Sequence, residues 1–230
     1  MDEIKDGKVN IDRYRVKEGT KVNLKKYSTA CDVVIDKAKV KSLYFPEVIE
    51  KVKDLQEKLY AQNTYGLIIV LQAMDAAGKD GTVNHVFANL DPGGVKVVSF
   101  KQPTSEEKDH DYMWRINKAL PERGDIGIFN RSQYEDVIVT RIHDLIHKGQ
   151  LPQELIHKDF WEERYEQINN WEKYLHQNGF QMVKIFLHVS RNSSAASWTA
   201  SSTSRRTGNS PCPILMKDST GTGIRNSMKK

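Results

Sequence analysis

The chain has 230 residues, of which 38% are hydrophobic and 28% are charged, and its formal net charge is +5. These proportions are ordinary for a soluble globular protein and predict one main domain with a substantial core. No apolar run approaches the ~20 residues of a membrane helix, the first residues are charged rather than signal-like, and Cys31 and Cys212 offer neither a disulfide framework nor metal-ligand spacing, so we expect a cytoplasmic protein.

The first half of the chain begins with a polar, weakly patterned segment over residues 1–44, which we expect to wrap the core as an arm. Pro46 then opens a predicted helix whose apolar residues recur at helical spacing as far as Asn63. Residues 66–71 form a continuous apolar run between turn residues. Such a run is typical of a strand buried on both faces of a parallel sheet.

Three further apolar runs predict buried strands over residues 95–100, 126–129 and 182–189. Helical patterns separate the runs and follow the third one, over residues 82–90, 106–120, 133–147 and 152–177. Strands that alternate with helices favour right-handed crossovers. We therefore predict an α/β fold, with a parallel sheet that helices cover on both faces.

A phosphate-binding loop is predicted directly after the first strand, at residues 72–82, where the sequence reads Gln-Ala-Met-Asp-Ala-Ala-Gly-Lys-Asp-Gly-Thr. Backbone N–H groups at a helix N-terminus bind oxyanions, and Lys79 adds a mobile positive charge. Gly78 would let the backbone approach a phosphate closely. The predicted phosphate-binding residues are Ala76, Ala77, Gly78, Lys79, Asp80, Gly81 and Thr82.

This loop departs from the strict Walker A pattern at two positions. Ala73 stands at the first glycine position, and Asp80 stands where a Ser or Thr would bind magnesium. A loop without that hydroxyl needs another metal ligand, and the carboxylate of Asp75 is the obvious one. The alternative is an ordinary strand-to-helix turn in which Asp80 caps the helix.

A second candidate segment, residues 124–136, follows the third predicted strand. Ligands of open α/β sheets bind beyond the carboxyl ends of the strands, so Asn130 and Arg131 are expected beside the phosphate loop. Arg131 could neutralise charge on a phosphoryl group during transfer. The alternative makes Asn130 a helix cap and Arg131 a surface ion-pair partner.

Several segments together resemble the polyphosphate kinase 2 family, and the similarity runs from about residue 10 to Ser190. The segments are residues 74–82, 99–104, 109–115, 120–124 and 128–132. The resemblance implies a thymidylate-kinase-like P-loop fold and a dependence on Mg²⁺. It also implies transfer of the terminal phosphate of inorganic polyphosphate to a nucleoside mono- or diphosphate, with AMP as well as ADP as acceptors.

The resemblance further implies roles for individual residues. Asp75 would hold metal, Lys79 would contact the transferring phosphates and Arg131 would stabilise their charge. Asn130, where many family members carry Asp, would be a second metal ligand. The acceptor nucleotide would approach Lys101, Asp109 and Arg115, for which surface charge is the competing interpretation. We expect a homo-oligomer that binds neither nucleic acid nor membranes.

The composition changes abruptly after Ser190, so we divide the chain into a kinase domain over residues 1–190 and a basic tail over residues 191–230. The tail carries a net charge of +6, which leaves −1 for the rest of the chain. It shows no periodicity and few large apolar groups, so it is predicted to be disordered. Its basic residues are Arg191, Arg205, Arg206, Lys217, Arg225, Lys229 and Lys230.

A frameshift near codon 190 would explain this tail. When the codons that could encode the tail are read from their third base, permissive choices give Lys-Glu-Gln-Leu-Arg-Arg-Phe-Leu-Asp-Arg-Ile and a continuation that resembles the family. In the frame as written, we expect the C-terminal lid and the last strand to be missing. The strand at 182–189 would then have an uncovered edge.

Two other functions fit the same residues. The first is an ATP-dependent small-molecule kinase on a P-loop scaffold. The second is a catalytically impaired polyphosphate-binding remnant, because the lid arginines are absent from this reading frame.

Overall fold

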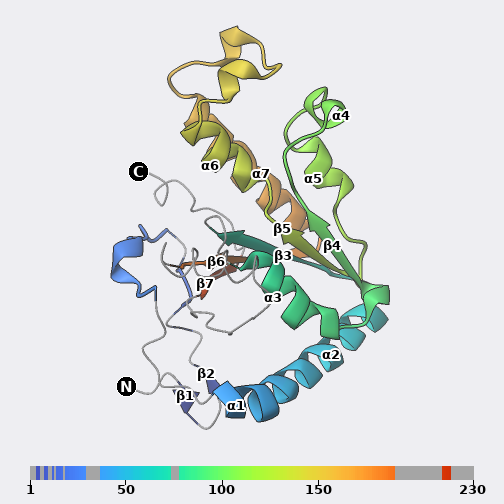
Figure 1. Cartoon of the computed structure of the whole chain (residues 1–230). Coiled ribbons are helices and arrows are strands. Elements are labelled where there is room, and N and C mark those ends of the chain that lie inside the picture. Colours follow the sequence, from blue (N-terminus) through green and yellow to red (C-terminus); the bar gives the residue numbers. More distant parts are fainter. Residues whose placement is uncertain are drawn as a thin grey trace, which may run out of the picture.

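The structure is a computed structural model that describes residues 4–5, 8–9, 12, 14–17, 19–29, 37–73, 78–189 and 214–218. A five-stranded sheet with the strand order β4-β5-β3-β6-β7 lies at its centre (Figure 1). The strands are β3 (Gly66–Ala73), β4 (Val95–Ser99), β5 (Ile126–Asn130), β6 (Phe180–Leu187) and β7 (Ile214–Asp218). Strands β3 to β6 run parallel, which confirms the predicted sheet.

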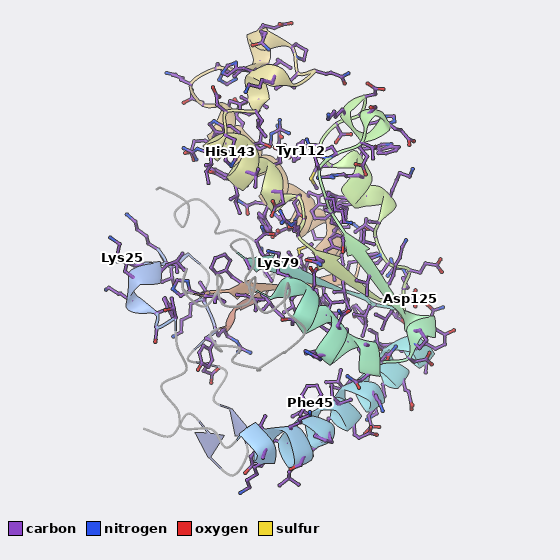
Figure 2. All side chains as sticks on the ribbon, in the orientation of Figure 1. Lys25, Phe45, Lys79, Tyr112, Asp125 and His143 are labelled. Atoms are coloured by element: carbon purple, nitrogen blue, oxygen red, sulfur yellow. The ribbon has the colours of Figure 1, made fainter. Side chains whose placement is uncertain are left out.

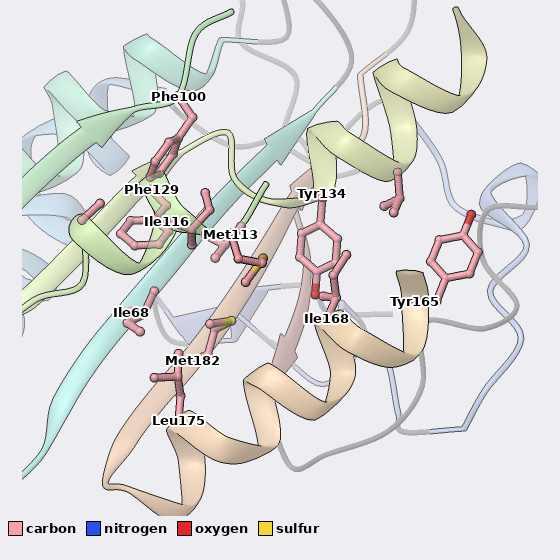
Figure 3. Close-up of a cluster of buried hydrophobic side chains, with 13 residues drawn as sticks. Ile68, Phe100, Met113, Ile116, Phe129, Tyr134, Tyr165, Ile168, Leu175 and Met182 are labelled. Atoms are coloured by element: carbon pink, nitrogen blue, oxygen red, sulfur yellow. The ribbon is translucent and has the colours of Figure 1, made fainter. Parts of the chain in front are cut away.

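Helices cover both faces of the sheet, as predicted (Figure 1). On one face lie α2 (Phe45–Gln62) and α3 (Lys79–Val86), and on the other lie α5 (Trp114–Lys118), α6 (Tyr134–Ile142) and α7 (Phe160–Gln177). Alternate side chains of a strand point to opposite faces. Ile68 and Val70 therefore pack towards α7 (Figure 3), whereas Leu67, Ile69 and Leu71 pack towards α2 and α3. This division explains why the whole run is apolar.

The remaining elements are short. Strands β1 (Ile4–Lys5) and β2 (Lys8–Val9) form a separate antiparallel pair. Helix α1 (Lys37–Lys39) continues through a π-helical turn (Val40–Tyr44) into α2, so helical structure begins before Pro46. Short 3₁₀ turns cover Leu24–Lys26, Phe87–Asn89, Pro92–Gly94, Ile146–Lys148 and Gln153–Leu155. None of the helices in the described ranges combines the length and the apolar character needed to cross a bilayer.

The helix predicted over 82–90 begins three residues earlier, at Lys79, and three other predicted helices also differ from the observed ones. The helix predicted over 106–120 is interrupted between α4 (Ser105–Lys108) and α5. There the backbone N–H of Met113 donates to Asp111 Oδ1 at 2.9 Å, which closes a turn typical of Asp. Helix α6 ends at Ile142, ahead of Asp144, whose φ of 48° is left-handed. Helix α7 begins at Phe160, because the chain after Pro152 forms a 3₁₀ turn first.

The expectation of an uncovered β6 edge is wrong. Strand β7 pairs antiparallel with β6, with Leu187 opposite Ile214 and Val183 opposite Asp218. The run Ile-Leu-Met at 214–216 is apolar and can form a strand, although the sequence around it is polar. Residues 190–213 and 219–230 lie outside the described residues, so the boundary at Ser190, the disordered tail, the missing lid and the frameshift stay predictions.

Candidate active site

The carboxyl ends of three parallel strands meet at one edge of the sheet. Leu71 of β3 pairs with Asn130 of β5, which pairs in turn with Ser99 of β4. Lys79 lies at this edge, at the start of α3, and Asp125 lies at the opposite edge, just before β5 (Figure 2). The two motifs found in the sequence are therefore side by side, as the predicted fold requires.

The start of α3 has the backbone geometry of a phosphate-binding turn. Gly78 precedes the helix with a φ of +85°, a backbone conformation that residues other than glycine rarely adopt. Within the described part of the chain, a Cβ at Gly78 or Gly81 would meet nothing within 4 Å, so no described residue fills the space in front of either glycine. The hydroxyl of Thr82 donates to Gly78 O at 3.2 Å. Asp75, Ala76 and Ala77 lie outside the described residues.

Lys79 is held close to the end of β3. Its side chain is buried, with a residue exposure of 8%. Its Nζ donates a hydrogen bond to Ala73 O, the last residue of β3, at 3.2 Å. The ammonium group therefore lies beside the carboxyl end of β3, near the positive end of the α3 dipole, instead of extending into solvent. The helix dipole and the Lys79 ammonium group are both positive at this place, and together they favour an anionic ligand.

Asn130 and Asp80 contact each other directly. Asn130 Nδ2 donates to Asp80 Oδ1 at 2.5 Å, and Asn130 is buried. Neither residue is the helix cap that the alternative interpretation requires. Gly78 occupies the capping position of α3, and Gln133 occupies that of α6. The contact places an amide and a carboxylate, both oxygen-bearing groups, beside the phosphate loop.

Arg131 stands at a sharp turn after β5. Its backbone N–H donates to Leu71 O at 3.0 Å and extends the β3–β5 pairing by one residue. Its φ of 67° then turns the chain towards α6, a left-handed conformation that costs roughly 1–2 kcal/mol outside glycine. Arg131 Nη1 donates to Glu135 Oε2 at 3.1 Å. The predicted alternative, a surface ion pair, describes this contact only in part, because the side chain of Glu135 is 16% exposed.

The three predicted acceptor-binding residues do not form one cluster. Arg115 Nη1 donates to Lys101 O at 2.8 Å and lies 3.5 Å from Glu107 Oε2. Asp109 Oδ1 instead accepts a hydrogen bond from Gln150 Nε2 at 2.9 Å. Arg115 and Lys101 thus lie together beyond the carboxyl end of β4. Asp109 instead connects the segment after α4 with the loop that contains Gln150.

A buried network of polar residues beside the site was not predicted from the sequence. Arg164 Nε lies 3.6 Å from Asp136 Oδ2, and the Arg164 guanidinium lies 3.7 Å from the centre of the Tyr112 ring. Burial raises the pKa of Asp136, and the positive charges of Arg164 and Arg115 oppose that rise. The signal in the sequence is that Arg164 lies one helical turn from the buried Ile168 of α7.

A second polar network lies deeper, under α7. The carboxylate of Glu172 accepts hydrogen bonds from the Tyr134 hydroxyl and from Lys184 Nζ. Burial, and then the neighbouring carboxylate, raise the pKa of Tyr134 well above its ordinary value. These contacts join α6, α7 and β6, and Tyr134 is the first residue of α6, three residues after Arg131.

Comparison with protein families and curated relatives gives consistent matches. The model of the polyphosphate kinase 2 (PPK2) family matches residues 35–204. An ADP-polyphosphate phosphotransferase of Rhodopseudomonas palustris is 43% identical over 187 residues, which are 80% of this chain and 65% of the relative. An AMP/ADP-polyphosphate phosphotransferase of Meiothermus ruber is 38% identical over 181 residues, 78% of this chain and 64% of the relative. The chain thus spans slightly less than two thirds of these relatives.

The fold has a close counterpart among solved structures. Polyphosphate kinase 2 from Arthrobacter aurescens TC1 superposes with a TM-score of 0.73 and 34% sequence identity, over 86% of this chain and 67% of that one. This likeness, together with the parallel sheet and the turn at Gly78, confirms the expected P-loop kinase-like fold.

Proposed function

Because this chain belongs to the polyphosphate kinase 2 family, we propose that it transfers the terminal phosphate of inorganic polyphosphate to AMP or ADP. The observation that carries the proposal is the meeting of two segments at one sheet edge. The Gly78–Lys79 start of α3 lies beside the turn at Asn130 and Arg131, joined by the contact between Asp80 and Asn130. The relatives' names support polyphosphate as donor.

Phosphoryl transfer requires mainly positioning and charge neutralisation, with little covalent participation by the protein. In the proposed mechanism, the backbone N–H groups at the start of α3 and the Lys79 ammonium bind the oxygens of the transferring phosphate. Arg131 offsets the negative charge that spreads over these oxygens during transfer. The acceptor nucleotide approaches from the β4 side, near Lys101 and Arg115.

The residues of the site also fit a magnesium ion. Mg²⁺ prefers oxygen ligands, usually one or two protein oxygens together with phosphate oxygens. Asp80 and Asn130 provide such groups in direct contact with each other, and the motif would add the carboxylate of Asp75. A bound Mg²⁺ would neutralise charge on the phosphates. Among the described residues no group of three or more His, Cys, Asp and Glu side chains forms a separate metal site.

One assay separates this proposal from the two other functions. The purified chain is incubated with polyphosphate, Mg²⁺ and either ADP or AMP in the absence of ATP, and newly formed ATP or ADP is measured. Product formation supports the proposal, whereas phosphorylation that requires added ATP supports an ATP-dependent kinase. Binding of polyphosphate without turnover supports an impaired remnant, and a frame-restored version of the chain then tests whether the tail is responsible.

We also propose that the protein acts in the cytoplasm as a homo-oligomer. Two cysteines at unrelated positions are compatible with a reducing compartment. Sedimentation of the purified chain measures its oligomeric state directly, and a monomer at micromolar concentration would contradict the second part of this proposal.

A further inference from the structure

Gln72 is a polar residue at the end of an otherwise apolar strand. It lies in β3 and is 8% exposed. Its Nε2 donates a hydrogen bond to one carboxylate oxygen of Glu135, and the other oxygen accepts from Arg131 Nη1 at 3.1 Å. One carboxylate therefore connects the strand that leads into the phosphate loop with the arginine that follows β5.

A second buried glutamine shows what a purely structural amide looks like in this protein. Gln56, in α2, is 4% exposed and both ends of its amide are satisfied by Asp91. Gln56 Nε2 donates to Asp91 O at 2.8 Å, and the backbone N–H of Asp91 donates to Gln56 Oε1 at 3.0 Å. This pair fastens α2 to the loop before β4.

In the described part of the chain, the side-chain amide of Gln72 has a hydrogen-bond partner for its Nε2 but not for its Oε1. Its Oε1 is buried and has no hydrogen-bond partner within the described part of the chain. A buried acceptor without a partner costs free energy that an apolar side chain of similar size would avoid. The feature of Gln72 that compensates for this cost is the N–H group directed at Glu135.

Arg131 needs such support. Its backbone has already turned into the left-handed region, and its long side chain is 38% exposed. An exposed ion pair on its own holds an arginine weakly, because both side chains lose conformational freedom when they pair. A carboxylate that a second, buried donor fixes in place presents one orientation to the guanidinium and makes the pair more rigid.

We propose that Gln72 is a positioning residue that orients the Glu135 carboxylate and, through it, the guanidinium of Arg131. The role of Arg131 towards phosphate rests on the proposed function, whereas the positioning of its side chain by Gln72 does not. Gln72 itself is not expected to touch either substrate.

The first test needs no ligand and no activity. The guanidinium NMR signals of Arg131, assigned by their loss in Arg131→Lys, are compared in the parent, in Gln72→Leu and in the matched control Gln56→Leu. We expect the signals to broaden or shift in Gln72→Leu and to stay unchanged in Gln56→Leu, even if both variants lose stability. Unchanged Arg131 signals in a folded Gln72→Leu protein would overturn the proposal.

The second test is a double-mutant cycle on polyphosphate-dependent turnover. Gln72→Leu should lower kcat/KM about tenfold in the parent but less than about twofold in the Arg131→Lys background, because both changes remove the same oriented charge. Equal effects in the two backgrounds would contradict the proposal. If the parent shows no turnover, the proposed function fails, and the NMR comparison still decides the role of Gln72.

A third variant adds a readout that lost packing would not produce. Gln72→Glu places a second carboxyl group against Glu135, and two such carboxylates repel each other unless they share a proton. The Glu135 carboxylate should therefore leave its parent position, and the Arg131 signals of Gln72→Glu should differ from those of the parent. Parent-like Arg131 signals in Gln72→Glu would count against the proposed contact.

Discussion

Asn130 Nδ2 donates a hydrogen bond to Asp80 Oδ1 at 2.5 Å, and this contact fastens the end of β5 to the first turn of α3. The two residues lie in different sequence motifs, so the contact joins the two halves of the candidate active site. The neutral amide allows the carboxylate to approach without a cation between them.

Asn130→Asp should replace this hydrogen bond with two opposed carboxylates. A hydrogen bond to a charged group contributes about 1.5–3 kcal/mol, so the variant should unfold at lower temperature without magnesium. Magnesium should restore much of the loss, because a carboxylate is a stronger ligand for Mg²⁺ than an amide. Thermal unfolding with and without Mg²⁺ measures both effects, with the exposed Asn89→Asp as control. A weaker magnesium response than in the parent would show that residue 130 does not face the ion.

Lys79→Ala should abolish phosphotransfer and leave the fold intact. Removing one oriented charge from a transition state costs roughly 3–4 kcal/mol, which corresponds to a few hundred-fold or more in rate. Steady-state kinetics with polyphosphate and ADP measure the loss, and Lys58→Ala, an exposed position on α2, provides the control. Activity within about threefold of the parent would remove Lys79 from the mechanism.

Lys184→Met should strongly destabilise the protein, because it leaves the buried Glu172 carboxylate without its cation. Breaking a buried ion pair from one side costs about 3–5 kcal/mol. A triple variant that also carries Glu172→Met and Tyr134→Phe removes every polar partner and should unfold closer to the parent. Urea denaturation measures the stability of the parent, of Lys184→Met and of the triple variant. A Lys184→Met protein as stable as the parent would show that Lys184 does not stabilise the Glu172 carboxylate.

Asp136→Asn should change how stability depends on pH. Burial raises the pKa of Asp136 in the folded protein above its ordinary value of 3.8, so the folded state binds the proton more tightly than the unfolded state does. The parent should therefore lose stability relative to Asp136→Asn as pH rises from below 3.8 through the raised pKa. Urea midpoints across this interval test the sign. If the parent instead became more stable relative to the variant as pH rises, the positive charge of Arg164 would outweigh burial in setting the pKa of Asp136.

Removal of β7 should expose the edge of β6. A chain that ends at residue 213 should lose slow amide exchange in β6 and associate at micromolar concentration, because an open strand edge pairs with other chains. A chain that ends at residue 219 keeps the β6–β7 pairing and serves as the control. Equal exchange rates in β6 for the two chains would mean that β7 contributes nothing to this edge.

The sheet could be predicted from the sequence because its strands are buried on both faces and therefore read as unbroken apolar runs. The helix breaks near Asp111 and Asp144 could not, because single hydrogen bonds and one left-handed residue decide them. Strand β7 was missed because five residues in a polar segment form a strand only when a partner edge is present.

The candidate site was predictable in its parts and not in its connections. Lys79 and Arg131 follow apolar runs within recognisable motifs, so their placement at one edge could be inferred. The contacts of Asn130 with Asp80 and of Gln72 with Glu135 depend on strand register and side-chain rotamers between distant segments. Sequence spacing contains no direct record of either.

The position of β3 in the middle of the sheet has a consequence for folding during synthesis. This strand is made before both of its neighbours, and Gly66 pairs with Phe180 while Leu67 pairs with Ile126. A nascent chain that has not yet reached Ile126 therefore contains an apolar strand with two open edges. The centre of the sheet closes only after β6 has left the ribosome. The strand order therefore delays completion of the domain and leaves β3 accessible to chaperones until then.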